Sequence, residues 1–350
     1  MTRTIYLIRH AMPDIPLGER WCIGGLTDLP LSRLGRIQAA RLPFVPELAA
    51  AEAVFASTLI RAKETAEPLG RAVKAVPGLE EQRMGCWDGL PFREITARWP
   101  ALYEAREKDP SLLPEGAEPE RAVERRMRAA LARCLEESTG DIAVVSHKSA
   151  IASLTGGRSR LGYTAISVLR ETNGVLSVEK VGIPVLPALT DGLCLAMLRA
   201  AGADEKLTAH CRAVAAEADR LCAALGQAGL TLNAGDVHFA ALLHDLAKGE
   251  QEHAQVGGLW LRELGWPALA EIVRQHTEPD SDTLNEAGLV FLADKLVRGS
   301  ASVSLEERFA ASLEKCRTEE AKAAHGRRLS LALSLREQIA RLCGEKHISV

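Results

Sequence analysis

Apolar residues divide this chain of 350 residues into two halves with different spacing. In the first half, short apolar runs at residues 4–8, 53–56, 142–145 and 165–169 alternate with segments of helical periodicity. Such short runs, bounded by polar residues, are typical of buried strands in a mostly parallel sheet. In the second half, apolar residues recur at three- and four-residue steps, which is the spacing of helices. We therefore predict a three-layer α/β domain with a mostly parallel sheet, followed by an all-α domain.

Turn signals mark the boundary between the two halves. Asn173-Gly174 stands between two alternating runs, which is the signal of a hairpin with a type I′ turn. Pro184 and Pro187 follow and indicate a linker. We expect residues 1–184 to form the first domain and residues 191–350 the second. The helical tail of the second domain is expected to pack onto that domain or onto a dimer partner, so a homodimer stays open.

Composition excludes several classes of protein. The chain is 47% hydrophobic and 25% charged with a formal net charge of −3, which gives no electrostatic case for a nucleic-acid partner. There is no apolar run of about 18 residues, so we expect no membrane span. The apolar run at residues 5–8 is too short for the core of a signal peptide. Eight scattered cysteines without a CxxC pair indicate reduced thiols, and we expect a cytoplasmic protein.

Candidate chemistry follows three of the predicted strands. Arg9 and His10 come directly after the first, Arg61 lies in the first helical turn after the second, and His147 ends the strand at residues 142–145. Ligands bind at the carboxyl ends of strands in open α/β sheets, and a helix N-terminus favours an anion. Each residue alone is more often structural or solvated. Their convergence favours an anion site, most often for phosphate.

These residues belong to motifs that resemble the histidine phosphatase superfamily, also called phosphoglycerate mutase-like. The resemblance covers about residues 1–182 and rests on Leu7-Ile8-Arg9-His10, Asp28-Leu29-Pro30-Leu31-Ser32, Ser57 with Arg61-Ala62, Glu81 ahead of Gly85-Cys86-Trp87-Asp88-Gly89, and Val145-Ser146-His147. It implies that His10 attacks phosphorus and becomes a phosphohistidine, without a metal. It also implies that Arg9, Arg61 and His147 hold the phosphoryl oxygens. Glu81, in a loop that can hold a carboxylic acid against an apolar wall, would protonate the leaving oxygen.

The first half departs from the family pattern at two places that bear on the substrate. Lys148-Ser149 follows His147 where family members often carry glycine. The segment from His147 to the run at residues 165–169 is shorter than usual, which we expect to open the substrate side of the pocket. The family also implies an alternative chemistry, the transfer of the phosphoryl group to another hydroxyl, as in the mutases.

The second half carries four histidines and two aspartates at or beside predicted helix faces. Asp236 is expected to cap a helix that carries His244 and Asp245 within its apolar pattern. Burial of a carboxylate without a partner is costly, so we expect a metal or another cation there. The candidate ligands for one or two divalent metals are His210, His244, Asp245, His253, His276 and Asp294. The remaining histidines, which are expected to be structural or solvated, are His238, His325 and His347.

This half resembles the HD superfamily of metal-dependent phosphohydrolases over about residues 191–300. The pattern His210, His244-Asp245 and Asp294, with neighbouring residues, is most similar to the group that includes bacterial HD-type diadenosine tetraphosphate hydrolases. The resemblance implies that Asp245 bridges two metals bound by the other five candidate ligands. It also implies that Lys248 and Arg298 meet the substrate phosphate. The ions could be Fe, Mn, Mg, Co or Zn.

Together these patterns predict a two-domain phosphohydrolase. The first domain would hydrolyse phosphomonoesters through a phosphohistidine. The second would use metal ions to hydrolyse a phosphoester or phosphoanhydride, with a nucleotide as one candidate. We expect a small phosphorylated metabolite or nucleotide as the partner, with neither nucleic acid nor membrane. The alternative function is one catalytic phosphatase domain with the other domain acting as a sensor of a phosphorylated ligand, or mutase-type transfer.

Overall fold

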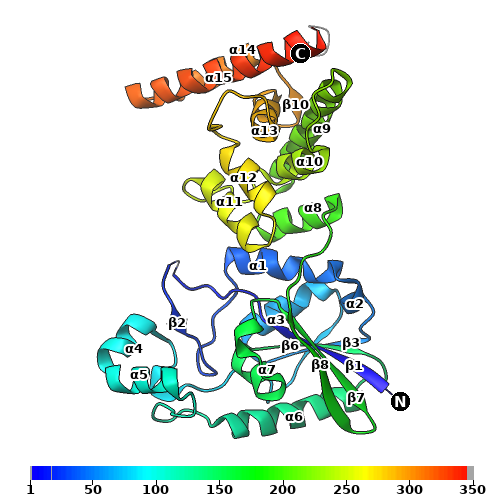
Figure 1. Ribbon diagram of the computed structural model, residues 1–350, viewed down its shortest axis with the longest axis vertical. Helices are drawn as coiled ribbons and strands as arrows, with labels where there is room; N and C mark the ends of the chain where they lie inside the picture. Colours follow the sequence, from blue (N-terminus) through cyan, green and yellow to red (C-terminus); the bar gives the residue numbers. More distant parts are fainter. Residues whose placement is uncertain (1, 17, 345–350) are drawn as a thin grey trace. The chain divides into compact units, whose positions relative to one another are not determined.

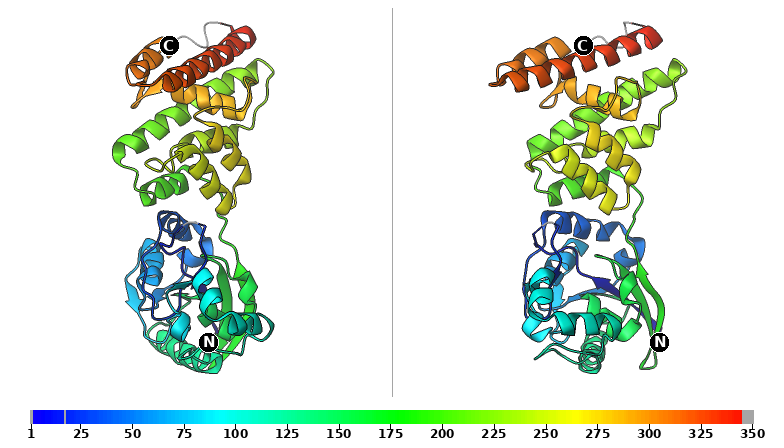
Figure 2. Two further views of the ribbon diagram at one scale, coloured as in Figure 1. Left: turned by 90° about the vertical axis from the view of Figure 1, so that its left-hand side faces the viewer. Right: turned by 60° about the vertical axis from the view of Figure 1, so that its left-hand side comes forward.

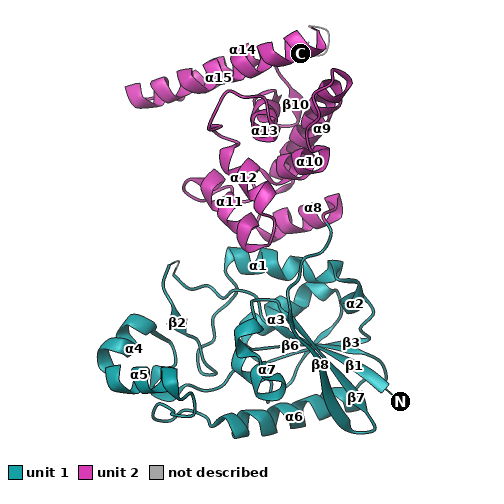
Figure 3. Cartoon of the chain, viewed as in Figure 1, with its two compact units in different colours: residues 1–188 teal, residues 189–350 magenta. Residues whose placement is uncertain are grey.

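The computed structural model describes residues 2–16 and 18–344 (Figure 1), so His347 lies outside the described residues. The chain divides into two compact units, residues 1–188 and 189–350 (Figure 3). The first is an α/β unit with a mostly parallel sheet, and the second is largely helical. Each unit is described by itself.

The centre of the first unit is a six-stranded sheet with the order β4-β3-β6-β1-β7-β8. The strands β4, β3, β6 and β1 are mutually parallel, β7 is antiparallel to β1, and β8 is antiparallel to β7. Asn173 and Gly174 join β7 to β8 with φ angles of 51° and 84°, the positive values that a type I′ turn requires. The strands are β1 (Thr2–Arg9), β3 (Ala53–Ala56), β4 (Val73–Ala75), β6 (Ile142–Ser146), β7 (Ile166–Thr172) and β8 (Val175–Ile183).

Alternation along the strands gives the sheet two apolar faces, each covered by helices (Figure 2). Ile5 and Leu7 of β1 point to one face, where they pack with buried residues of α6 (Glu120–Glu136) and α7 (Lys148–Thr155). Ile8 points to the other face, towards helices that precede and follow β3. Residues of α2 (Pro46–Ala49) and α3 (Ile60–Ala66) belong to the apolar cluster on this face, and α1 (Arg33–Ala40) packs against α3.

A smaller substructure stands beside the sheet. The short strands β2 (Trp21–Cys22) and β5 (Leu90–Pro91) pair antiparallel, and α4 (Phe92–Arg98) and α5 (Pro100–Lys108) follow. Its own core contains Cys22, Trp87 and Ile95. The remaining short helices of the first unit are 3₁₀ turns, η1 (Leu42–Phe44), η2 (Glu67–Leu69), η3 (Gly85–Trp87) and η4 (Arg158–Arg160).

Most helices of the second unit begin at a side-chain cap. Thr190, Asp204, Asn285 and Thr318 each accept a hydrogen bond from a backbone N–H of the first turn. Ser304 and Glu307 form a complete capping box. The elements are α8 (Asp191–Ala200), α9 (Glu205–Gln227), α10 (Ala234–Leu243), α11 (His253–Glu263), α12 (Pro267–Gln275), α13 (Glu286–Lys295), β9 (Val297–Arg298), β10 (Ala301–Ser302), α14 (Leu305–Leu313) and α15 (Glu319–Cys343).

Helix α13 is the centre of this unit. Eight consecutive residues, 287–294, are buried, and α13 packs against α9, α10, α12 and α15. A helix that is apolar on every side belongs in the core. None of the described helices is long and apolar enough to cross a membrane.

One expectation for this unit was wrong in detail. The cap of α10 is Asn233, whose side chain accepts from the backbone N–H of Asp236, and not Asp236 itself. The helix ends at Leu243, so His244 is its C-cap and Asp245 lies in the following turn rather than within the helix. The turn frees both side chains from the helical pattern, so they can face the other helices of the unit.

Candidate active sites

Strand order brings the candidate residues of the first unit together. Strands β1 and β6 are parallel neighbours with Arg9 opposite Ser146, so His10 and His147 leave the sheet side by side. Their ring centroids are 4.9 Å apart. Strand β3 is the other neighbour of β6, and Arg61 lies in the first turn of α3, just after β3. The site therefore forms at the carboxyl ends of three adjacent parallel strands.

The imidazole of His10 is held in one tautomer. Its Nδ1 lies 2.7 Å from the carbonyl oxygen of Ala11, an acceptor, so Nδ1 donates and Nε2 keeps the lone pair. Burial, together with the charges of Arg61 and Arg9, lowers the pKa of His10 well below its ordinary value. A buried, neutral imidazole with a free Nε2 can act as a nucleophile at neutral pH.

Three residues around His10 carry buried nitrogens that have no partner among the described residues. Arg61 is fully buried, and its two terminal nitrogens donate to the carbonyls of Thr27 (2.6 Å) and Gly24 (3.2 Å), but its Nε has no partner among the described residues. Neither ring nitrogen of the fully buried His147 has a described partner, and the Nε of Arg9 has none either. An unpaired buried polar group costs about 1–3 kcal/mol. These groups are suited to the oxygens of a bound anion.

Glu81 is tied to the segment that follows His147. Its carboxylate accepts from the backbone N–H groups of Ser149 and Ala150, all at 3.1 Å, in the first turn of α7. The side chain is 7% exposed. Glu81 and His10 both line one cavity, so the carboxyl group and the imidazole face the same space.

The cavity has a volume of about 560 Å³. Its wall combines rings, including Trp21, Trp87 and Phe92, with several cationic side chains. Sequence reasoning missed Tyr163, whose ring lies 4.0 Å from the guanidinium carbon of Arg9 and 5.9 Å from the ring of His10. Its neighbour Thr164 has a φ of 58°, which a residue other than glycine rarely adopts, and such strain often marks functional sites.

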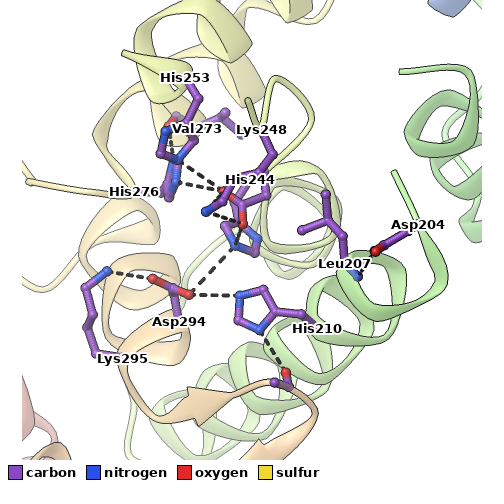
Figure 4. Close-up of polar contacts among 12 residues, drawn as sticks. Asp204, Leu207, His210, His244, Lys248, His253, Val273, His276, Asp294 and Lys295 are labelled. Atoms are coloured by element: carbon purple, nitrogen blue, oxygen red, sulfur yellow. Dashed lines mark hydrogen bonds and ion pairs between the residues drawn. The ribbon is translucent and has the colours of Figure 1, made fainter. Parts of the chain in front are cut away.

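The six candidate metal ligands of the second unit meet at one place: Figure 4 labels five of them, and Asp245 joins them through its contacts with His244, His253 and His276. The Nε2 of His210 lies 3.1 Å from Asp294 Oδ1, and the Nε2 of His253 lies 3.1 Å from Asp245 Oδ1. His276 Nε2 lies 3.7 Å from the same oxygen of Asp245. Ligand atoms of His210, His244 and Asp294, and those of His244, Asp245 and His276, lie within 4.8 Å of one another.

The histidines of this cluster are oriented as metal ligands usually are. His210, His244 and His276 direct Nδ1 to a backbone carbonyl at 2.7–2.9 Å, which leaves each Nε2 as an acceptor facing the cluster. The buried Nε2 of His244 has no hydrogen-bond partner among the described residues. An unmatched lone pair beside two buried carboxylates fits a cation. One lone pair binds one ion, so His244 can complete only one of the two ligand groups at a time.

The titration of Asp245 and His276 also suits a cation. Burial alone would raise the pKa of Asp245, but the neighbouring side chains of His244, His253 and His276 outweigh it and hold that pKa well below its usual range. Burial lowers the pKa of His276 to about 4, so its imidazole is neutral at pH 7. Neutral imidazoles and ionised carboxylates are the forms that bind divalent metals.

The two residues predicted to bind the substrate phosphate, Lys248 and Arg298, differ in their contacts with the cluster. Lys248 Nζ is 3.0 Å from Asp245 Oδ2 with a half-exposed side chain, so it stands at the edge of the cluster. Arg298 is exposed in β9, and no described hydrogen bond or ion pair joins it to the six candidate ligands. Sequence reasoning gave no role to Lys295, whose Nζ lies 2.6 Å from Asp294 Oδ2. Its position directly after a candidate ligand was the one available signal.

Comparisons with known proteins match both halves of the chain. The profile of the histidine phosphatase superfamily (branch 1) matches residues 5–180, and that of the HD domain matches residues 207–299. A glucosyl-3-phosphoglycerate phosphatase of Mycobacterium tuberculosis is 29% identical over 172 residues, 45% of this chain and 76% of that protein. One from Mycolicibacterium vanbaalenii is 28% identical over 165 residues, 44% and 72% of the two chains. A solved structure of the mycobacterial enzyme covers 52% of this chain and 100% of its own, with 24% identity and a TM-score of 0.45.

Proposed function

The chain belongs to the histidine phosphatase superfamily and carries an HD domain, and from this premise we propose how each half of the two-domain phosphohydrolase works. In the first half, Nε2 of His10 attacks the phosphorus of a phosphomonoester. Arg9, Arg61 and His147 donate to the phosphoryl oxygens as negative charge is redistributed over them. The observation that carries this proposal is the set of buried, unpartnered nitrogens on these three residues around His10.

Proton transfer completes the cycle. Glu81 gives a proton to the leaving oxygen as its bond to phosphorus breaks. It then takes a proton from the water that attacks the phosphohistidine, which releases inorganic phosphate and frees His10. Capture by a second hydroxyl in place of water would be the mutase-type alternative. The substrate is a small phosphorylated metabolite, and glucosyl-3-phosphoglycerate is the first to test, since the relatives carry its name.

Rapid quench tests the phosphoenzyme. Mixing the enzyme with a radiolabelled phosphomonoester should trap acid-labile, base-stable phosphate on His10, and His10→Ala should carry none. His238→Asn is a matched control, because His238 lies in the other unit and binds two aspartates. Label that persists in His10→Ala at the wild-type level would refute the assignment. Stoichiometric phosphate binding without turnover or trapped label would favour the sensor alternative.

In the second half, we propose that the six-residue cluster holds one or two divalent metals. The residues would be His210, His244, Asp245, His253, His276 and Asp294, and a bound metal would supply positive charge to polarise the phosphoryl group. Lys248, at the edge of the cluster, would bind a substrate phosphate. Arg298 is the weaker candidate, because it is exposed and makes no described hydrogen bond or ion pair with the cluster. Phosphoesters or phosphoanhydrides of nucleotides are the substrates we propose to screen.

The test separates the two halves within one protein. In His10→Ala, nucleotide hydrolysis should require metal, disappear with a chelator and return with one added divalent ion. Asp294→Asn in the same background should lower both metal content and this activity. Chelator-resistant hydrolysis in His10→Ala would contradict the metal proposal. Loss of metal without loss of hydrolysis would contradict it equally.

A further inference from the structure

The cavity beside His10 carries more positive charge than a phosphoryl group alone uses. Besides Arg9, its lining includes Arg20, Arg106, Lys148 and Arg158, against the carboxylates of Glu19 and Glu81. The two carboxylates offset only part of this charge. Glu19 pairs with Arg93, which is not part of the lining, at 2.8 Å, and Glu81 is occupied by backbone N–H groups of α7.

The surplus cations lie close enough to repel one another. Burial and then the charges of Arg9 and Arg158 lower the pKa of Lys148, although Glu81 acts in the opposite direction. Burial and then the charge of Arg158 lower the pKa of Arg106. Lys148 has no carboxylate partner among the described residues, and the nearest carboxylate to Arg158, on the exposed Glu120, is 3.8 Å away. Like charges gathered in a partly buried wall are unfavourable unless an anion joins them.

The same wall presents polar atoms that the protein leaves unmatched. Trp87 is 2% exposed and its Nε1 has no described partner. Gln82 is 3% exposed; its Nε2 donates to the carbonyl of Glu118 at 2.7 Å, and its buried Oε1 has no described partner. Both residues line the cavity. A buried donor and a buried acceptor together suit a hydroxylated ligand.

From these features we infer that Lys148, Arg158 and Arg106 form a second anion subsite, which selects phosphomonoesters whose leaving group carries its own negative charge and hydroxyl groups. The inference rests on the proposed function, because it concerns the leaving-group side of the His10 site. The negative charge can be a carboxylate or a second phosphate, since both suit a cluster of lysine and arginine. Gln82 and Trp87 would bind hydroxyls of the same group.

A matched set of six-carbon substrates tests the subsite. Glucose 6-phosphate has a neutral leaving group, 6-phosphogluconate adds a carboxylate, and glucose 1,6-bisphosphate adds a second phosphate. We expect the full-length wild type to prefer one or both anionic substrates in kcat/KM by about tenfold or more, the worth of one charge-assisted contact. Preference for the carboxylate alone or for the bisphosphate alone would support the subsite and identify its ligand. The preference should shrink as salt is raised, because screening weakens exposed charges.

Variants then locate the preference. Lys148→Met with Arg158→Gln should abolish it while kcat/KM for glucose 6-phosphate stays within about twofold, since neither side chain is part of the proposed catalytic set. Arg160→Gln is the matched control: it changes an exposed arginine of the same 3₁₀ turn that does not line the cavity. Equal rates for all three substrates in the wild type would overturn the inference. Equal losses on all three in the double variant would also overturn it.

Phosphoenzyme trapping keeps this outcome separate from the proposed function. If all three substrates label His10 equally well, the nucleophile stands and the subsite fails. If none labels His10 and turnover persists, the proposed mechanism itself fails.

Discussion

Replacement of Arg126 by methionine should destabilise the first unit and displace the loop that carries Glu81, although Arg126 is not among the residues that line the cavity. Arg126 reaches from α6 and donates to the carbonyls of Gly78 (2.9 Å), Glu80 (2.7 Å) and Glu81 (3.1 Å). It also makes a bidentate pair with the buried carboxylate of Glu118, at 2.8 and 2.9 Å. Burial alone would raise the pKa of Glu118, but Arg126 outweighs it and keeps that pKa low, so the carboxylate is charged at neutral pH.

The size of the stability loss follows from the Glu118 carboxylate, which the variant leaves buried and unpaired. Removing one partner of a buried ion pair costs about 3–5 kcal/mol, because the other charge remains buried and unpaired. For a unit of this size, each kcal/mol shifts the melting temperature by about 2–4 °C, so we expect a fall of roughly 6–20 °C. A displacement of Glu81 by about 1 Å would lower turnover of alkyl phosphates by about 100-fold. Activated aryl phosphates should lose less, since their leaving oxygen needs little protonation.

The assay needs a transition that belongs to the first unit. Vanadate, which mimics a transferring phosphoryl group, should raise the melting temperature of that unit alone, so the shifted transition identifies it. Arg128→Met is the matched control, because Arg128 is on the same helix and makes an exposed pair with Glu124. Exposed pairs contribute about 0–1 kcal/mol, so this control should melt and turn over almost as the wild type does.

Two results would refute this reasoning. One is an Arg126→Met protein with the melting temperature of the Arg128→Met control. The other is an equal loss on alkyl and aryl phosphates, which would show that Arg126 supports the fold without positioning Glu81. Adding Glu118→Gln to Arg126→Met should restore part of the stability, since it removes the unpaired charge but leaves the three carbonyls without their donor.

Three further outcomes are expected. Glu81→Gln should lower kcat for alkyl phosphates by about 100-fold or more and for aryl phosphates much less. Steady-state rates on both kinds of substrate test this, and equal losses would count against the acid role. Asp245→Asn should lower the metal content of the purified protein and the melting temperature of the second unit, because metal binding is coupled to folding; unchanged metal stoichiometry by elemental analysis would contradict the ligand set. Burial alone would lower the pKa of His238, but Asp191 and Asp219 outweigh it and raise that pKa above 6.5. His238 should therefore stabilise the second unit fully below about pH 6.5 and lose this effect as pH rises through the raised pKa. The stability difference between wild type and His238→Asn, measured by denaturation at pH 6 and pH 9, should shrink; a difference that grows would refute it.

Sequence predicted the fold class and both families, and these predictions are confirmed. Apolar runs were enough for the four central strands, because a buried strand leaves a continuous apolar signal. The strand β4 has no such signal, since Val73-Lys74-Ala75 is short and largely exposed at the edge of the sheet. The strands β2 and β5 could not be predicted from the pattern either, because two-residue strands depend on tertiary pairing and not on local sequence.

The same limit applies to the sites. His10, Arg61 and His147 could be predicted to meet, because parallel strands end at one edge of a sheet. Tyr163 and Arg126 could not be predicted, because their places depend on which loop returns to β1 and on how α6 crosses the Glu81 loop. Asp245 was predicted as a cluster residue, but its position in a turn depends on where α10 stops.

The buried groups without partners require ligands of opposite charge in the two units. Around His10 the groups without a described partner include the Nε–H of Arg9 and that of Arg61, which are donors on positively charged side chains, so the missing partner is an anion. In the second unit the unmatched atom is Nε2 of His244, an acceptor because its Nδ1 donates, and it lies beside the ionised Asp245, so the missing partner is a cation. One rule, that buried polar groups are matched, therefore predicts a phosphoryl group for one site and a metal for the other. In the proposed function both partners serve the hydrolysis of phosphate esters. The first unit would supply the positive charge that holds the phosphate, and the second would supply the ligands of a metal ion that carries that charge.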